Sequence, residues 1–212
     1  MKSDILFVET KEILSFFNNE RMHWFPNTRK GADKKLLKNK KYSKKFVFIS
    51  SVKQTKGINE IIKATKELDV SYTIDIYGPI QDSKYSIDYF STEKVNYMGV
   101  ISPENVLKTL SSYDVLLLPT YHPGEGYPGI IIEAFSVGLP VITTNWQAIP
   151  EIIDNQVNTL LIEPQKTQEL VEAMQFFNEE NYSNFSKNAL IKFEEFKYEN
   201  VYKRIIDIIE KK

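Results

Sequence analysis

The stretch VLLLPTYHPGEGYPGIIIEAF, residues 115–135, decides the fold class of this chain. It opens with four apolar residues, continues through a loop rich in glycine and proline, and ends in an apolar run that contains a carboxylate. This order predicts a buried strand, a loop that approaches a ligand closely, and a helix that begins near Gly129. The first amides of that helix, with the positive end of the helix dipole behind them, form a site for an anion such as phosphate.

The sequence on either side repeats the order of strand and helix. Apolar runs predict five more strands, at residues 46–50, 72–77, 95–99, 141–144 and 160–163. Other helices are expected from Gly57, from Ser102, and near residues 168–177, 183–194 and 199–210. Strands of near-continuous Val, Ile and Leu favour a parallel sheet covered on both faces. The predicted fold class is therefore α/β, a doubly wound parallel sheet with extra C-terminal helices, which binds its ligand at the carboxyl ends of the strands.

Composition excludes several classes of function. The 212 residues are 42% hydrophobic and 26% charged, which is typical of a packed domain, and the net charge of −1 argues against nucleic acid as a partner. The absence of cysteine removes thiolate nucleophiles and cysteine zinc sites, and two histidines far apart in sequence exclude a multi-histidine metal cage. No run approaches the length of a membrane-spanning helix and the first residues do not begin a signal peptide, so we expect a cytoplasmic protein without a metal.

Residues 28–45 form a break in composition, with nine basic residues against the single acid Asp33. We interpret this segment as an exposed linker between a short N-terminal piece, residues 1–27, and the main domain, residues 46–212. A solvated run is the simplest interpretation of such charges. Contact of the basic residues between Lys34 and Lys45 with membrane phosphates, at the inner membrane face, is the alternative.

Two carboxylates, Glu125 and Glu133, stand on either side of the predicted helix start. Glu125 lies in the loop, where it can reach a polar ligand beside the phosphate, and Glu133 lies about one turn into the helix, where it can accept hydrogen bonds from a diol. Taken alone, they also fit a solvated loop acid and a partner of the helix dipole. The glycines at 124, 126 and 129 match the dinucleotide fingerprint G-x-G-x-x-G, but the match comes after the fourth predicted strand and lacks the acid expected after the next one.

The segments 125–135 and 138–142 resemble the Glu-x7-Glu signature of retaining, GT-B-fold glycosyltransferases of the family-4 type. Further parts of the resemblance follow in order along the chain, at Lys56-Gly57, Met98-Gly99-Val100, Leu118-Pro119-Thr120 and Ile149-Pro150-Glu151-Ile152. The resemblance covers the main domain. It implies the Rossmann-like C-terminal half of a GT-B fold, which binds a nucleotide-diphosphate sugar as donor substrate, with a UDP-sugar as the first expectation and no other cofactor.

The resemblance also implies roles for individual residues. Glu125 would contact the donor sugar and Lys56 would neutralise the diphosphate, so these two are the expected catalytic residues. Glu133 would bind the ribose hydroxyls, and the backbone near Val100 would receive the base.

Backbone amides of the signature would hold the diphosphate. The loop passes through Gly126, and because Pro128 has no N–H, the expected donors are Gly129, Ile130 and Ile131. The sequence departs from the family at Ser51, where an arginine is usual five residues before the lysine. One of two cations on the departing diphosphate is therefore missing from the first loop.

A larger departure is that residues 1–27 resemble only the last strand and helix of the N-terminal acceptor domain. The leading hypothesis is a glycosyltransferase that acts with retention on a sugar, lipid-linked or polysaccharide acceptor, with this chain as its donor-binding half. The alternatives are a non-catalytic nucleotide-sugar-binding subunit completed by a separate acceptor-domain protein, a sugar-nucleotide epimerase of the same fold, and a membrane or RNA module built on the basic linker.

Overall fold

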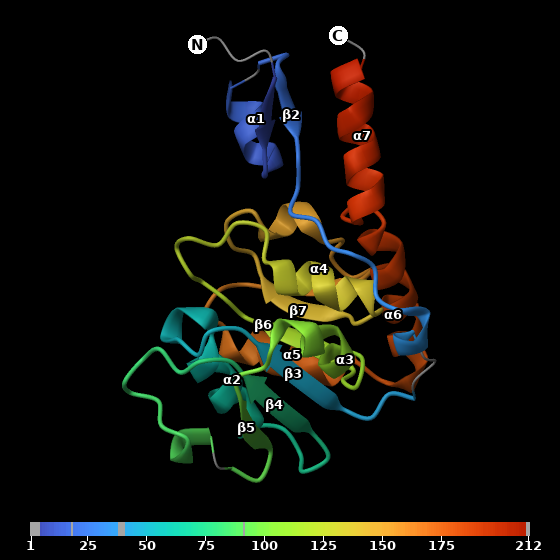
Figure 1. Ribbon diagram of the computed structural model, residues 1–212. Coiled ribbons are helices and arrows are strands. Elements are labelled where there is room, and N and C mark those ends of the chain that lie inside the picture. Colours follow the sequence, from blue (N-terminus) through green and yellow to red (C-terminus); the bar gives the residue numbers. More distant parts are fainter. Residues whose placement is uncertain (1–4, 18, 38–40, 91, 211–212) are drawn as a thin grey trace.

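A computed structural model describes residues 5–17, 19–37, 41–90 and 92–210. Within this part of the chain, the main sheet has six parallel strands in the order β5-β4-β3-β6-β7-β8 (Figure 1). Their bounds are β3 (Lys45–Ile49), β4 (Thr73–Tyr77), β5 (Val95–Gly99), β6 (Val115–Leu118), β7 (Val141–Thr144) and β8 (Thr159–Ile162). The strand order reverses between β3 and β6, so the carboxyl ends of these two neighbours form the switch point at which doubly wound sheets bind ligands.

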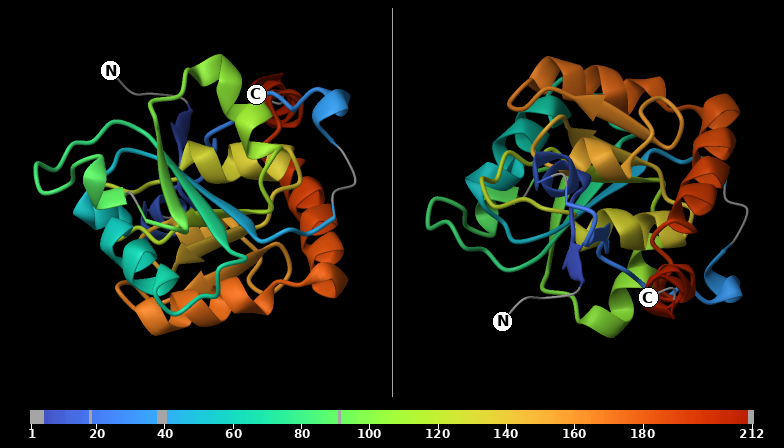
Figure 2. Two further views of the ribbon diagram at one scale, coloured as in Figure 1. Left: turned by 90° about the horizontal axis from the view of Figure 1, so that it is seen from below. Right: turned by 90° about the horizontal axis from the view of Figure 1, so that it is seen from above.

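Helices cover both faces of the sheet (Figure 2). On one side α2 (Ile58–Thr65) packs against α5 (Thr167–Phe176), and on the other α4 (Gly129–Ser136) packs against both α3 (Val106–Leu110) and α6 (Glu179–Phe193). All four residues of β6 and of β7 are buried, which explains why their sequences are continuous in apolar residues or threonine. The predicted α/β class and doubly wound parallel sheet are confirmed.

Two predicted helices differ from the structure at their first turns. The helix expected from Ser102 is a 3-10 turn, Pro103–Asn105, followed by the short α3, and the Ser102 side chain makes no capping hydrogen bond to the backbone. Helix α6 begins four residues earlier than expected. Asn178 and Asn181 form a capping box there, each side chain accepting a hydrogen bond from the backbone of the other.

The first and the last described elements project from the same end of the main domain (Figure 1). The N-terminal piece consists of β1 (Leu6–Val8), α1 (Lys11–Phe17) and β2 (Met22–Trp24), with the two strands parallel, and α7 (Tyr198–Glu210) rises beside it. The Arg204 guanidinium lies 5.1 Å from the centre of the Trp24 ring, and the rings of Phe25 and Tyr202 are 5.9 Å apart. The sequence predicted one strand and one helix here, and the structure adds β2.

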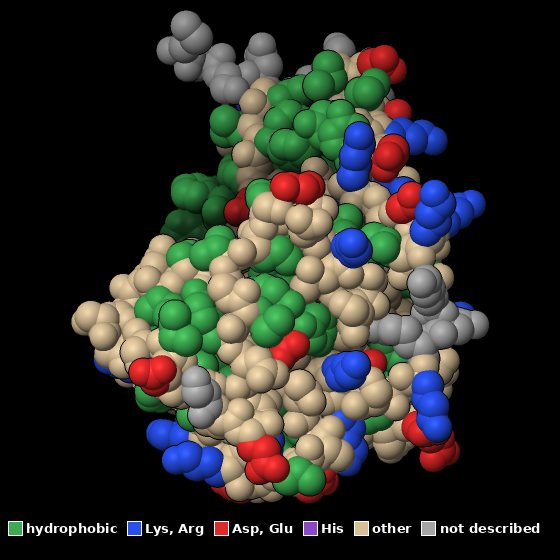
Figure 3. Space-filling model, turned by 60° about the horizontal axis from the view of Figure 1, so that its bottom comes forward, with side chains coloured by type: hydrophobic (Ala, Val, Ile, Leu, Met, Phe, Trp, Pro, Cys, Tyr) green, Lys and Arg blue, Asp and Glu red, His purple; other side chains and the backbone are tan. Residues whose placement is uncertain are grey.

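Large apolar side chains are exposed on these projecting segments, and Figure 3 shows them gathered near the chain ends. They include Leu6, Phe7, Ile13, Phe16 and Phe17 in the N-terminal piece, and Tyr198, Tyr202, Ile206 and Ile209 on α7.

In the described residues no helix combines the length and the apolar character needed to cross a bilayer.

The basic segment from residue 28 is only partly solvated. Lys30, Lys34, Lys35 and Lys41 are exposed, as expected of a linker, whereas Arg29 is half-buried and paired with Glu133. A 3-10 turn, Lys34–Leu36, interrupts the segment. Residues 38–40, on which part of the expected membrane contact falls, lie outside the described residues, and that contact stays a prediction.

Candidate functional site

The buried ion pair between Lys56 and Glu125 lies where the loops after β3 and β6 meet. The Lys56 Nζ donates to a Glu125 carboxylate oxygen at 2.5 Å, and only 11% and 10% of the two side chains is exposed. The hydroxyl of Thr120, itself fully buried, donates to the same oxygen at 2.6 Å. The two residues that the sequence assigned to catalysis are therefore in contact, and Thr120 holds the carboxylate in place.

Gly57 allows this contact. Its φ is +82°, a left-handed conformation that closes the 3-10 turn Gln54–Lys56 and begins α2. A Cβ on Gly57 would lie 2.2 Å from the Pro119 carbonyl oxygen at the end of β6. Only glycine satisfies both constraints, so the Lys-Gly pair brings the lysine against the neighbouring strand end.

The amino end of α4 supplies free backbone donors. The first two helical residues, Gly129 and Ile130, have amides with no hydrogen-bond partner in the described part of the chain, as expected at a helix start. The Ile131 amide, which the sequence analysis included among the donors, instead donates to the Pro128 carbonyl at 3.0 Å. Of these three expected donors, two are therefore free to bind an anion.

A cavity of about 300 Å³ opens at the carboxyl ends of β3, β4 and β5. Its lining includes Val100 and Glu133, to which the resemblance assigns the base and the ribose, and Ser51, which stands where the family usually has an arginine for the diphosphate of the same donor. Ile49, Gly78 and Ile101 contribute to its walls. Gly126 lies apart from this cavity, in the signature loop beside the Glu9 carboxylate of the N-terminal piece.

Arg29 is a site residue that the sequence analysis missed. Its Nε donates to a Glu133 carboxylate oxygen at 2.6 Å, although the two residues are 104 positions apart. Its Nη1 donates to the Asn27 side-chain oxygen at 2.5 Å, and the Asn27 amide nitrogen donates in turn to the Tyr127 carbonyl. The segment before the main domain thus reaches into the signature loop.

His122 and Trp146 lie beside the ion pair. The His122 ring contacts the Thr55 hydroxyl at 3.1 Å through Nδ1, and the Trp146 indole N–H donates to the His122 carbonyl at 2.8 Å. Both side chains are partly buried, and Trp146 packs against the core. Their contacts fix the conformation of the loop between β6 and α4.

A second set of contacts ties the N-terminal piece to the same loop. The Glu151 carboxylate accepts hydrogen bonds from the backbone amides of Lys11 and Glu12 at 2.5 and 3.0 Å, which caps the start of α1. The Tyr127 hydroxyl donates to the same carboxylate, and burial, followed by this hydrogen bond, raises the pKa of Tyr127.

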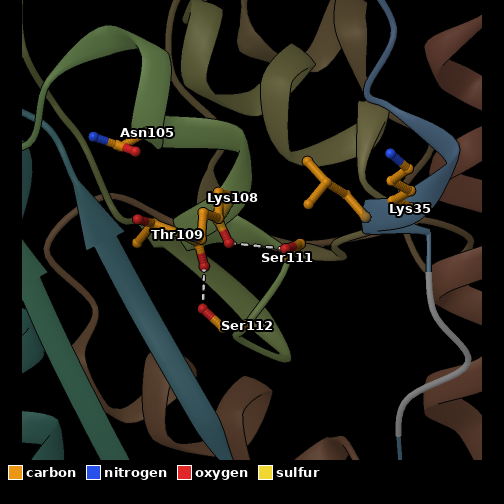
Figure 4. A pocket seen from close by; sticks show the side chains of 7 residues that line it. Lys35, Asn105, Lys108, Thr109, Ser111 and Ser112 are labelled. Atoms are coloured by element: carbon orange, nitrogen blue, oxygen red, sulfur yellow. Dashed lines mark hydrogen bonds between the residues drawn. The ribbon is translucent and has the colours of Figure 1, made fainter.

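Figure 4 shows a larger hollow, of about 550 Å³, between the basic segment and α3. Lys35, Lys108, Asn105 and three hydroxyl residues line it. The hydroxyls of Ser111 and Ser112 donate to backbone carbonyls of the helix turn before them, at 2.8 and 2.6 Å. None of the residues expected to bind a donor borders this hollow, so it is a separate feature.

Comparison with known proteins agrees with this fold and shows the family. A family model described as "Glycosyl transferases group 1" matches residues 29–192. The amylovoran biosynthesis glycosyltransferase AmsK of Erwinia amylovora is 29% identical over 125 residues, which are 54% of this chain and 31% of that protein. Among solved structures, Anabaena Alr3699/HepE in complex with UDP has a TM-score of 0.82 at 16% identity, over 99% of this chain and 64% of that one.

The C-terminal domain of the glycosyl transferase group 1 family protein LpcC from Francisella tularensis is also similar. Its TM-score is 0.63 at 17% identity, over 76% of this chain and 96% of that one. The curated relatives are longer, and this chain spans between 30% and 44% of their length.

The chain belongs to the glycosyl transferases group 1 family. The resemblance drawn from its sequence is confirmed for the family and for the Rossmann-like architecture of a GT-B domain.

Proposed function

We propose that this chain binds a nucleotide-diphosphate sugar and forms the donor half of a glycosyltransferase that acts with retention. A UDP-sugar is the first candidate, since solved relatives were crystallised with UDP or UDP-glucose. The reaction would move the sugar to an acceptor held by a further domain.

One observation supports the proposal most strongly, the convergence of three different groups on one edge of the sheet. The Lys56–Glu125 pair, the two free amides of α4 and the cavity lined by Glu133 follow strands β3 to β6. A nucleotide-diphosphate sugar also has three parts, a sugar, a diphosphate and a nucleoside, and they follow one another in the order in which these three groups were just named. The carboxylate suits sugar hydroxyls, the amides and the lysine suit the phosphates, and the cavity with Glu133 suits the ribose and base.

Transfer breaks the bond between the anomeric carbon and a phosphate oxygen, so negative charge develops on the leaving diphosphate. Lys56 and the amides of Gly129 and Ile130 are fixed before the reaction, which makes them effective at stabilising that charge. Lys56 is held by Glu125 in the structure, and we propose that it is shared between this carboxylate and the diphosphate when the donor binds.

The acceptor site requires more protein than this chain. We propose that a second domain, from a longer form of the chain or from a separate protein, packs against the projecting segments. The support is the exposed apolar surface of α1 and α7, together with the greater length of the relatives. A chain that binds the donor but transfers no sugar until such a domain is added would be the non-catalytic subunit considered above.

The test is a panel of thermal unfolding measurements with millimolar UDP, GDP, CMP and dTDP and their sugars. A ligand at 100 times its Kd stabilises the folded state by about 2.7 kcal/mol, which is easily measured as a rise in Tm. Glu133→Ala should remove the rise, because the ribose loses its carboxylate. Glu67→Ala, which removes an exposed carboxylate in the turn after α2, is the matched control and should keep it.

A rise in Tm with one nucleotide that is lost in Glu133→Ala and kept in Glu67→Ala would support the proposal and name the base. The absence of any rise across the panel would contradict donor binding by this chain.

A further inference from the structure

We infer that Arg29 is a further donor-binding residue, which contacts the diphosphate from outside the main domain and positions Glu133 for the ribose. The inference rests on the proposed function and adds to it a residue from the segment before β3. It is carried by three observations: a fixed backbone, an oriented side chain, and space left for the guanidinium at the start of α4.

The backbone of Arg29 is fixed at the junction of α6 and α7. Its amide donates to the Phe196 carbonyl at 3.1 Å, and its carbonyl accepts from the Tyr198 amide at 2.9 Å. These two bonds form a parallel bridge with Lys197. The side chain of Arg29 therefore starts from a backbone position that two hydrogen bonds hold in place.

The guanidinium is oriented by its neighbours. Nε bonds to Glu133, and Nη1 bonds to the Asn27 side chain and to the Thr28 carbonyl at 2.9 Å. Asn27 uses both ends of its amide, since it also donates to the Tyr127 carbonyl. In the described residues Nη2 has no hydrogen-bond partner, so its two protons remain available to a ligand.

Nη2 lies over the first residue of α4. A Cβ built on Gly129 would lie 1.8 Å from Nη2, and Gly129 does not have a positive φ. Glycine at this position therefore leaves the space that the guanidinium occupies here, and a larger residue would displace it.

This placement sets a cation beside the free amides of Gly129 and Ile130. A positive group next to the positive end of a helix is repelled unless negative charge lies between them. Glu133 supplies one negative charge, which pairs with Arg29. A diphosphate at the helix start would supply the negative charge that the positive end of α4 attracts. Arg29 can bind both together, because a guanidinium presents several donors in a rigid fork.

The arrangement also accounts for Ser51. The first loop of this chain has a serine where the resemblance implies an arginine, and Ser51 lines the same cavity as Glu133. Arg29 brings a second cation to that region from another part of the sequence.

The test compares UDP with uridine, or the corresponding pair for the base that the panel selects, by isothermal titration calorimetry, with uridine measured by displacement of UDP. Loss of a charge-assisted contact predicts that Arg29→Gln lowers the ratio of UDP affinity to uridine affinity by roughly tenfold. Lys30→Gln removes a neighbouring exposed charge and should leave the ratio unchanged. If Arg29→Gln does not fold, Arg29→Lys keeps the charge without the fork and should lower the ratio severalfold.

An unchanged ratio in the folded arginine variant would overturn the inference while leaving the proposed function intact. Tighter UDP binding in Arg29→Gln would also overturn it, because the arginine would then be a competitor for Glu133. If the wild-type chain binds no nucleoside diphosphate of the panel, the proposed function fails, and the role of Arg29 fails with it.

Discussion

The main domain buries its large apolar side chains, whereas the projecting segments leave many of theirs exposed. Phe46, Val47 and Phe48 of β3 have no exposed surface, whereas Phe16 and Phe17 of α1 are 81% and 61% exposed. Helix α1 has no buried residue, and Val201 is the only buried residue of α7. A two-stranded parallel sheet with one short helix cannot enclose a core, so the N-terminal piece depends on its contacts with the rest of the protein.

The comparison teaches that the packed core, and with it the stability, belongs to the main domain, while the projecting segments leave apolar surface exposed. Three predictions test this division. They are ordered from the largest expected effect to the smallest.

The largest effect is expected from a phenylalanine pair. Phe48→Ala leaves a cavity in the core and should lower the free energy of unfolding by about 3–5 kcal/mol. Phe16→Ala removes a ring that lies mostly in water and should change it by less than about 0.5 kcal/mol. Urea unfolding measures both variants, and equal losses would show that the division is wrong.

Breaking the ion pair should come next. Lys56→Met leaves the Glu125 carboxylate buried beside Thr120 without its cation, and we expect a loss of about 3 kcal/mol in the free energy of unfolding. The double variant Lys56→Met/Glu125→Gln should lose less than the single one, since no unpaired charge remains. Chemical denaturation of the single and double variants provides the comparison, and additive losses would argue against a coupled pair.

The smallest effect should be local to the N-terminal piece. Glu151→Ala removes the cap of α1, which is worth about 1 kcal/mol. Hydrogen exchange of the amides in α1 should therefore rise about fivefold, while exchange in β6 and β7 stays the same. A rise of the same size in the central strands would mean that the piece is an integral part of the main fold.

The strands of the main sheet were predictable because a strand buried on both faces has a continuous run of apolar residues in its sequence. The runs at 95–99 and 141–144 coincide with β5 and β7, and the others differ by a residue or two at their ends. Strand β2 was not predicted. Its sequence, Met-His-Trp, is short and half-buried, and among the described residues its one partner strand is β1.

The site was predictable where motif residues come from loops that follow adjacent strands, as Lys56 and Glu125 do. Arg29 was not, because it belongs to a basic run that is typical of a solvated linker and meets Glu133 only through the fold. Thr120 had a usable signal, since it follows the end of β6 by two residues and directly precedes the signature loop. The role of Glu151 depends on a helix 139 residues earlier in the chain, and no local pattern points to it.

Of the two tryptophans of this chain, one lies in the main domain and the other in the N-terminal piece. The Trp146 indole is bonded to the signature loop through the His122 carbonyl, and the Trp24 indole is bonded to the Glu9 carbonyl and the Tyr127 hydroxyl at the base of the N-terminal piece. Their intrinsic fluorescence is therefore a built-in optical reporter for each region. In Trp146→Phe the remaining emission follows the docking of the N-terminal piece, and in Trp24→Phe it follows the signature loop, which we propose contacts the donor.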